Sequence, residues 1–109
     1  MRRYGSCIRL RSDRIEAYKR LHAETWPSVL HRIEACNIRN YSIFLKQPEN
    51  FLFAYFEYHG DDFAADMAKM AGDPETQRWW KLTDPMQEPF ETRADGEWWA
   101  QMDEVFHTD

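Results

Sequence analysis

Alternating side chains near the N-terminus predict a β-strand over residues 3–10. Successive residues of a strand point to opposite sides, so Tyr4, Ser6, Ile8 and Leu10 fall together on one face. We expect this more apolar face to pack against the rest of the fold.

A helix is predicted to follow this strand. Ser12 and Asp13 are typical capping residues, and Glu16 places a carboxylate in the first turn, where the helix dipole favours negative charge. From Ile15 onward, large residues recur at steps of three and four, which is the spacing of one helical face. The stripe consists of Ile15, Tyr18, His22, Trp26, Val29 and Ile33.

Pro27 is expected to divide this helix in two. Proline fits the first turn of a helix but disrupts its interior. We therefore expect Thr25 to cap a second segment that runs from Trp26 to about Cys36 and ends at Asn37.

The middle of the chain predicts an antiparallel hairpin. Residues 38–46 and 51–58 are rich in β-branched and aromatic types, and Gln47-Pro48-Glu49-Asn50 supplies the turn between them. 

Two more helices and a last strand are predicted after the hairpin. Asp61-Asp62 caps the first helix and Gly72 closes it, while Asp73 caps the second with Pro74 at its first position. Residues 84–97, with two prolines and five acidic residues, predict a long loop. Residues 101–107 are the candidate final strand.

This order of elements predicts an α+β fold in which helices cover one face of an antiparallel sheet. The other face would remain bare although the hairpin directs large apolar side chains towards it. Pairing of two sheets in a homodimer would cover that face.

Composition and charge limit the classes of function. The 109 residues fit one domain spanning 1–109, and 14 Lys and Arg against 19 Asp and Glu give a net charge of −5. An acidic chain without basic clusters argues against nucleic-acid or membrane-surface binding. The longest apolar run, Phe51 to Phe56, is too short to span a membrane, and no signal peptide follows Met1. We expect a cytoplasmic protein in which Cys7 and Cys36 are reduced.

Tyr18 and His22 are the first candidates for chemistry. They are four residues apart on the predicted helix, so their side chains lie one turn apart on one face. One interpretation is a buried histidine bonded to a backbone carbonyl. The other is a general acid or base beside an orienting phenol, because imidazole titrates near neutral pH. The spacing leaves both open.

Other kinds of site have less support. His22 with Glu24, Glu57, His59 or Asp61 lacks the spacing of common metal motifs, so we expect no metal. Known nucleophile motifs are missing, and four glycines are too few for a phosphate-binding loop, so no cofactor is expected.

Aromatic residues, at 16% of the chain, exceed what the core of a small domain needs. Sugars stack their C–H faces on aromatic rings and bond their hydroxyls to nearby polar groups. A pocket of this kind would use Tyr18, His22, Asn40, Tyr41, Trp79 and Trp80. Alternatively, one tryptophan of the pair lies in the core and the other at an interface, because adjacent helical residues point about 100° apart.

These residues, in this order, resemble the L-rhamnose mutarotase family. The resemblance covers nearly the whole chain and is carried by Tyr18-x-x-x-His22, Trp26-Pro27, Asn40-Tyr41-Ser42-Ile43, Asn50-x-Leu52-Phe53-Ala54, Gln77-x-Trp79-Trp80 and Glu104-Val105-Phe106. It implies an isomerase with a ferredoxin-like α+β subunit that dimerises through its sheet as a dimeric α/β-barrel, without metal or organic cofactor. It also implies that His22 is the proton donor and that the sugar contacts Tyr18, Tyr41, Trp79 and Trp80.

The chain departs from the family pattern after Trp80. Residues 85–99 form a longer and more acidic segment, and Trp98-Trp99 is a second pair without a counterpart. Because this segment could reshape the pocket, L-fucose or another 6-deoxyhexose is the alternative substrate to L-rhamnose.

Mutarotation through the open-chain aldehyde requires only proton transfers. One proton reaches the ring oxygen and another leaves the anomeric hydroxyl. We expect protonated His22 to donate the first, with water, Tyr18 or a carboxylate such as Asp84 accepting the second. Two other functions fit the predicted fold: a cofactor-independent dimeric ferredoxin-like monooxygenase, and a non-catalytic module that binds sugar or haem.

Overall fold

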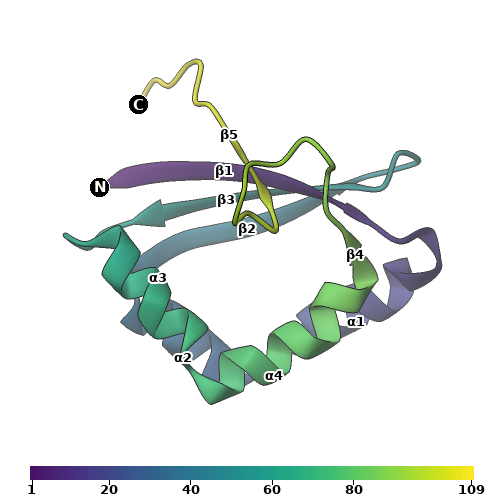
Figure 1. Ribbon diagram of the computed structural model, residues 1–109, viewed down its shortest axis with the longest axis horizontal. Coiled ribbons are helices and arrows are strands. Elements are labelled where there is room, and N and C mark those ends of the chain that lie inside the picture. Colours follow the sequence, from purple (N-terminus) through teal and green to yellow (C-terminus); the bar gives the residue numbers. More distant parts are fainter.

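The chain forms one antiparallel sheet with four helices on one of its faces, in a computed structural model that describes residues 1–109 (Figure 1). The elements in chain order are β1 (Arg2–Leu10), α1 (Ile15–Ala23), α2 (Pro27–Ala35), β2 (Ile38–Lys46), β3 (Phe51–Tyr58), α3 (Phe63–Ala71), α4 (Pro74–Thr83), β4 (Gln87–Glu88) and β5 (Ala100–Met102). The predicted α+β class, the hairpin and the helix positions are confirmed.

The strand order is β2-β3-β1-β4, with β5 also pairing with β1. Both short strands therefore share one edge of β1: β4 pairs with Arg9 and Leu10, and β5 pairs with residues from Gly5 to Cys7. This order, with helices in both crossovers, is that of a ferredoxin-like subunit. The loop between β4 and β5 leaves that edge and returns to it (Figure 1).

The core lies between the sheet and the helices. Ile8 and Leu10 of β1, Leu52 of β3 and Tyr18 of α1 form its buried cluster. Ile8 lies opposite Leu52 in the register of β1 and β3, so the predicted inner face of β1 meets an apolar row of its neighbour. Burial of each large aliphatic side chain contributes roughly 1.5–3 kcal/mol to folding.

Two of the predicted helix caps are confirmed. Asp62 accepts a hydrogen bond from the backbone N–H of Ala65 at 3.1 Å, and Asp73 accepts one from Thr76 at 3.0 Å. These carboxylates satisfy backbone donors that have no partner inside the helix.

The predicted caps of the first two helices are wrong. The chain enters α1 through a 3₁₀ turn, Ser12–Arg14, and no side chain caps either helix. Trp26 occupies the N-cap position of α2 because Pro27 is its first residue. Thr25 therefore lies one residue too early, and its hydroxyl donates instead to the carbonyl of His22 at 2.8 Å, which closes the end of α1.

The final strand is shorter than predicted. β5 ends at Met102, and the chain then turns away from the sheet towards the C-terminus (Figure 1). Beyond it, Glu104 meets the sheet through its side chain, which pairs with Arg3 at 2.7 Å. The predicted loop 84–97 contains a 3₁₀ turn, Asp84–Met86, and the two residues of β4.

The sheet face opposite the helices is bare (Figure 1). Phe44 and Phe53 are exposed there, on neighbouring strands and directly opposite each other in the register. None of the helices is both long and apolar enough to cross a membrane.

Candidate active site

A cavity of about 500 Å³ lies between the inner face of the sheet and the helices. All five residues implied by the resemblance line it: Tyr18, His22, Tyr41, Trp79 and Trp80. They come from α1, β2 and α4, which are far apart in the chain. The fold thus brings the sequence-predicted set together at one hollow.

The imidazole of His22 is held on three sides. Its Nδ1 lies 2.9 Å from the carbonyl oxygen of Tyr18, its ring stacks on the Tyr18 phenol with centroids 4.1 Å apart, and Trp79 meets it edge-on at 5.2 Å. In the neutral ring, Nδ1 must carry the hydrogen because a carbonyl oxygen only accepts. Nε2 is left to exchange a proton with a ligand. His22 thus makes the carbonyl bond of a core histidine and also lines the cavity.

Burial moves the pKa values of two groups in the cavity towards each other. It lowers the pKa of His22, although the bond to the Tyr18 carbonyl acts in the opposite direction. Burial also raises the pKa of Asp84, which follows α4 and lines the same cavity. Both shifts favour the uncharged forms, as expected where charges lose their hydration.

Tyr18 is a hydrogen-bonding group and not a base. Its side chain is buried, and this burial raises the pKa of its phenol well above the ordinary value. Its oxygen accepts a hydrogen bond from Nε2 of Gln87 at 3.1 Å. The phenol therefore keeps its proton, and Asp84 or water remains as the acceptor of the anomeric proton.

The tryptophan pair divides as the helical geometry predicts. Trp79 is 6% exposed and packs edge-on against Trp26, with centroids 5.2 Å apart, whereas Trp80 is 37% exposed. Both rings nevertheless line the cavity. Trp80 therefore offers its ring to a ligand, while Trp79 also supports His22.

Asn40 does not line the cavity, contrary to the pocket expected from the sequence. A bulge interrupts the pairing of β2 and β3 between Arg39 and Ser42, and Asn40 has a left-handed φ of 51°. Its side chain donates to Glu57 at 2.8 Å. The bulge places Asn40 out of alternation with the inward-facing residues of β2.

Sequence reasoning missed Gln87 and left the second tryptophan pair without a role. Gln87, Trp98 and Trp99 all line the cavity. Gln87 gave no signal because it lies on a two-residue strand after a proline turn, where no periodicity exists. The unexplained pair Trp98-Trp99 was the available signal for the rest.

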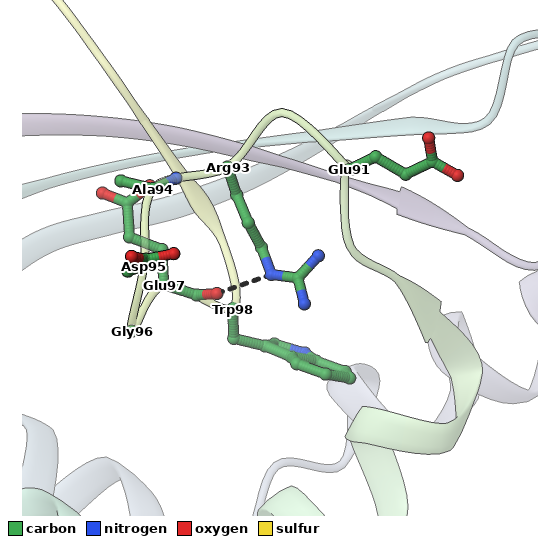
Figure 2. A pocket seen from close by; sticks show the side chains of 7 residues that line it. All are labelled: Glu91, Arg93, Ala94, Asp95, Gly96, Glu97 and Trp98. Atoms are coloured by element: carbon green, nitrogen blue, oxygen red, sulfur yellow. Dashed lines mark hydrogen bonds between the residues drawn. The ribbon is translucent and has the colours of Figure 1, made fainter.

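The loop that carries Trp98 is held by its own hydrogen bonds. Arg93 donates from Nη1 to the carbonyl of Phe90 at 2.9 Å and from Nε to the carbonyl of Glu97 at 2.8 Å. Figure 2 shows the second bond and the Trp98 ring, which turns from the loop towards the helices. The loop surrounds a second hollow of about 480 Å³ at the surface.

No three His, Cys, Asp or Glu side chains are grouped so as to hold a metal ion. Of the metal candidates considered from the sequence, Glu57 and His59 contact each other at 3.1 Å and lie outside the cavity lining.

Comparison with known proteins agrees with this geometry. The sequence profile of the L-rhamnose mutarotase family matches residues 3–108. The L-rhamnose mutarotase of Oceanobacillus iheyensis is 31% identical over 109 residues, covering 100% of both chains. That of Bacillus subtilis is 35% identical over 86 residues, which is 79% of this chain and 80% of the relative.

Solved structures share the fold. A crystal structure of L-rhamnose mutarotase from Formosa agariphila superposes with a TM-score of 0.80 at 22% identity, covering 100% of both chains. Tetracenomycin F2 cyclase from Streptomyces glaucescens, a type-II polyketide cyclase, superposes with a TM-score of 0.65 at 15% identity and covers 99% of this chain and 96% of its own. At these identities the likeness concerns the fold.

Proposed function

The chain belongs to the L-rhamnose mutarotase family, and from this premise we propose that it interconverts the α- and β-anomers of L-rhamnose. Such an enzyme is an isomerase. The observation that supports the reaction most directly is the placement of His22, whose Nε2 is unused by the protein and whose ring lines an aromatic-walled cavity.

His22 and Asp84 together provide the proton transfers. Ring opening needs one group that donates to the ring oxygen and one that withdraws the anomeric proton. Imidazolium at His22 and carboxylate at Asp84 supply these roles while the pair holds a single proton. After rotation about C1–C2 of the open-chain sugar, the two transfers run backwards on the other face of the aldehyde.

The lowered pKa of His22 makes its imidazolium a stronger acid, and the raised pKa of Asp84 makes its carboxylate a stronger base. Both changes assist the transfers, at the cost of a smaller population of the charged pair. A buried and partly apolar site is thus suited to moving protons without a cofactor.

The aromatic walls are suited to hold the sugar without fixing its anomeric carbon. Tyr41, Trp79 and Trp80 offer ring faces or edges, and Tyr18 offers a hydroxyl. Stacking holds a pyranose through its C–H faces and leaves C1 free to rotate. L-Rhamnose is the proposed substrate, and L-fucose, another 6-deoxyhexose, is its nearest alternative.

A homodimer formed through the bare sheet face completes the proposal. The exposed pair Phe44 and Phe53 supports it, because an apolar face of this kind is commonly covered by a second subunit. Both cysteines are free, which supports a location in the reducing cytoplasm.

Anomer exchange measured by saturation-difference NMR tests the proposal. The wild-type protein is expected to accelerate exchange of L-rhamnose, with L-fucose run beside it under the same conditions. Sugar binding without accelerated exchange of either sugar would instead indicate a binding module. Oxygen consumption with quinol substrates would indicate the monooxygenase.

A further inference from the structure

A buried row of three side chains connects the 85–99 segment to the cavity. Trp98 Nε1 donates to Gln87 Oε1 at 2.7 Å, and Gln87 Nε2 donates to the Tyr18 hydroxyl at 3.1 Å. The three residues come from the loop, from β4 and from α1. Gln87 is 7% exposed and Tyr18 is 5% exposed, so water does not compete freely for these bonds.

The chemistry of Trp98 fixes the direction of the whole row. An indole N–H donates and never accepts, so the group of Gln87 that faces it must be the amide oxygen. The NH₂ of Gln87 must then face Tyr18, and the phenol oxygen must accept. The Tyr18 hydrogen has no acceptor within the protein, so it is available to the cavity that Tyr18 lines.

The loop holds Trp98 in the position that this arrangement needs. Arg93 ties the carbonyls of Phe90 and Glu97 together, and Glu97 Oε1 accepts from the N–H of Ala94 at 3.1 Å (Figure 2). These bonds close the loop on itself immediately before Trp98. The indole N–H is therefore presented by an ordered segment.

We propose that Gln87 and Trp98 are positioning residues that direct the Tyr18 hydroxyl hydrogen into the cavity, where it donates to a lone pair of a sugar oxygen. This inference rests on the proposed sugar-binding function. It assigns to the segment that departs from the family pattern a role in ligand recognition: the sugar must present an acceptor to Tyr18, and a ligand with a C–H group there is disfavoured.

Three variants test the direction of the row. Gln87→Glu keeps the bond from Trp98 but offers Tyr18 only an acceptor, so the phenol must turn its hydrogen away from the sugar. Trp98→Phe keeps an aromatic ring and removes the N–H, so the Gln87 amide is free to flip. Tyr18→Phe removes the hydroxyl itself. Gln47→Glu, in the exposed hairpin turn, is the matched control for the added charge.

Each of the three variants is expected to weaken the dissociation constant for L-rhamnose roughly three- to tenfold, the usual value of one hydrogen bond. In the Tyr18→Phe background, Gln87→Glu and Trp98→Phe are expected to add less than twofold, because the hydroxyl they direct is gone. Gln47→Glu should bind as the wild type does. Equal effects with and without the hydroxyl, or no effect, would overturn the proposal.

A measurement without sugar separates this inference from the proposed function. In the free protein, the Gln87 side-chain NH₂ should show nuclear Overhauser contacts to the Tyr18 ring and not to the Trp98 indole N–H. The reverse pattern would overturn the inference even if anomers exchange normally. The expected pattern in a protein that exchanges no anomers would instead reject the function. If Gln87→Glu fails to fold, as judged by thermal melting, Trp98→Phe decides the cycle.

Discussion

The Nδ1 atom of His22 lies 2.9 Å from the carbonyl oxygen of Tyr18, one helical turn before it, while the rings of the same two residues stack with centroids 4.1 Å apart. One helix therefore fixes both the tautomer and the plane of the imidazole. A residue spaced four positions from its partner acquires a defined reactive atom, Nε2, without help from any other element.

Replacing His22 by Gln should remove most of the catalysed anomer exchange while the protein remains folded. Loss of a positioned acid typically costs 10²- to 10⁴-fold in rate. The side chain is half-buried, and Gln fills much of its volume, so the melting temperature should change little. Saturation-difference NMR on L-rhamnose measures the rate. His31→Gln, on the exposed side of α2, is the control, and exchange at the wild-type rate in His22→Gln would reject the assignment.

The catalysed rate should follow a bell-shaped curve against pH. The pair of His22 and Asp84 must hold one proton, so the rate falls at low pH, where both are protonated, and at high pH, where neither is. Because burial lowers the pKa of His22, the alkaline limb should lie below the ordinary histidine value of about 6.5. Because burial raises the pKa of Asp84, the acid limb should lie above the ordinary value of an aspartate.

These limbs belong to the pair, since protonated His22 with ionised Asp84 and the reverse arrangement contain the same number of protons. Asp84→Asn should lower the rate and remove the acid limb. The measurement is the exchange rate after subtraction of the buffer-catalysed rate at each pH. A flat profile between pH 4 and 8 would contradict the two-group mechanism.

The two adjacent tryptophans should respond differently to truncation. Trp79 is buried against Trp26 and His22, so Trp79→Ala should destabilise the fold by roughly 3–5 kcal/mol as well as weaken binding. Trp80 is far more exposed, so Trp80→Ala should weaken L-rhamnose binding while unfolding stays close to that of the wild type. Calorimetric titration and urea denaturation measure the two effects. Unchanged affinity in Trp80→Ala would argue against stacking.

The sequence predicts elements well where local patterns and core packing agree. The hairpin of β2 and β3 has matching turn chemistry and β-rich strands, and the carboxylates of Asp62 and Asp73 cap their helices as expected. The prediction fails where neighbours compete. Thr25 is a good capping residue in isolation, but Pro27 sets the start of α2 one residue later than Thr25 requires.

The site is predictable only in part for a related reason. Tyr18 and His22 share a helix, so their spacing reveals them. Gln87 joins the same site through a pairing with β1 and a bond to Trp98, neither of which leaves a periodic trace. Asn40 looks like a pocket residue, but a bulge takes its side chain to Glu57.

Gly60→Ala should lower stability by about 1–3 kcal/mol, as overpacking does in tightly filled sites. A methyl group at this position would collide with the Tyr58 phenol and come within 2.8 Å of Asp66 Oδ2. Neither group can move easily, because the Tyr58 hydroxyl donates to Asp66 at 2.5 Å and accepts from the N–H of Asp62 at 3.1 Å.

Thermal melting checks this expectation, and the decrease should be about 4 °C or more for a chain of this size. Gly72→Ala is the matched control, because a methyl group there meets only the Ala68 carbonyl oxygen at 3.4 Å. Equal melting temperatures for the two variants would mean that the polar cluster around Asp66 yields easily.

A charge placed on the bare sheet face should prevent dimer formation. Phe44 is 64% exposed there and lies opposite Phe53, so Phe44→Glu would introduce a carboxylate beside an apolar neighbour. In a face-to-face dimer this charge would lose its hydration without gaining a partner, which costs several kcal/mol per ion. Leu30→Glu is the matched control, because Leu30 is 54% exposed on α2, in the helix layer away from this face. Sedimentation velocity should show a dimer for the wild type and for Leu30→Glu, and a monomer for Phe44→Glu. A Phe44→Glu variant that sediments as a dimer would place the interface elsewhere.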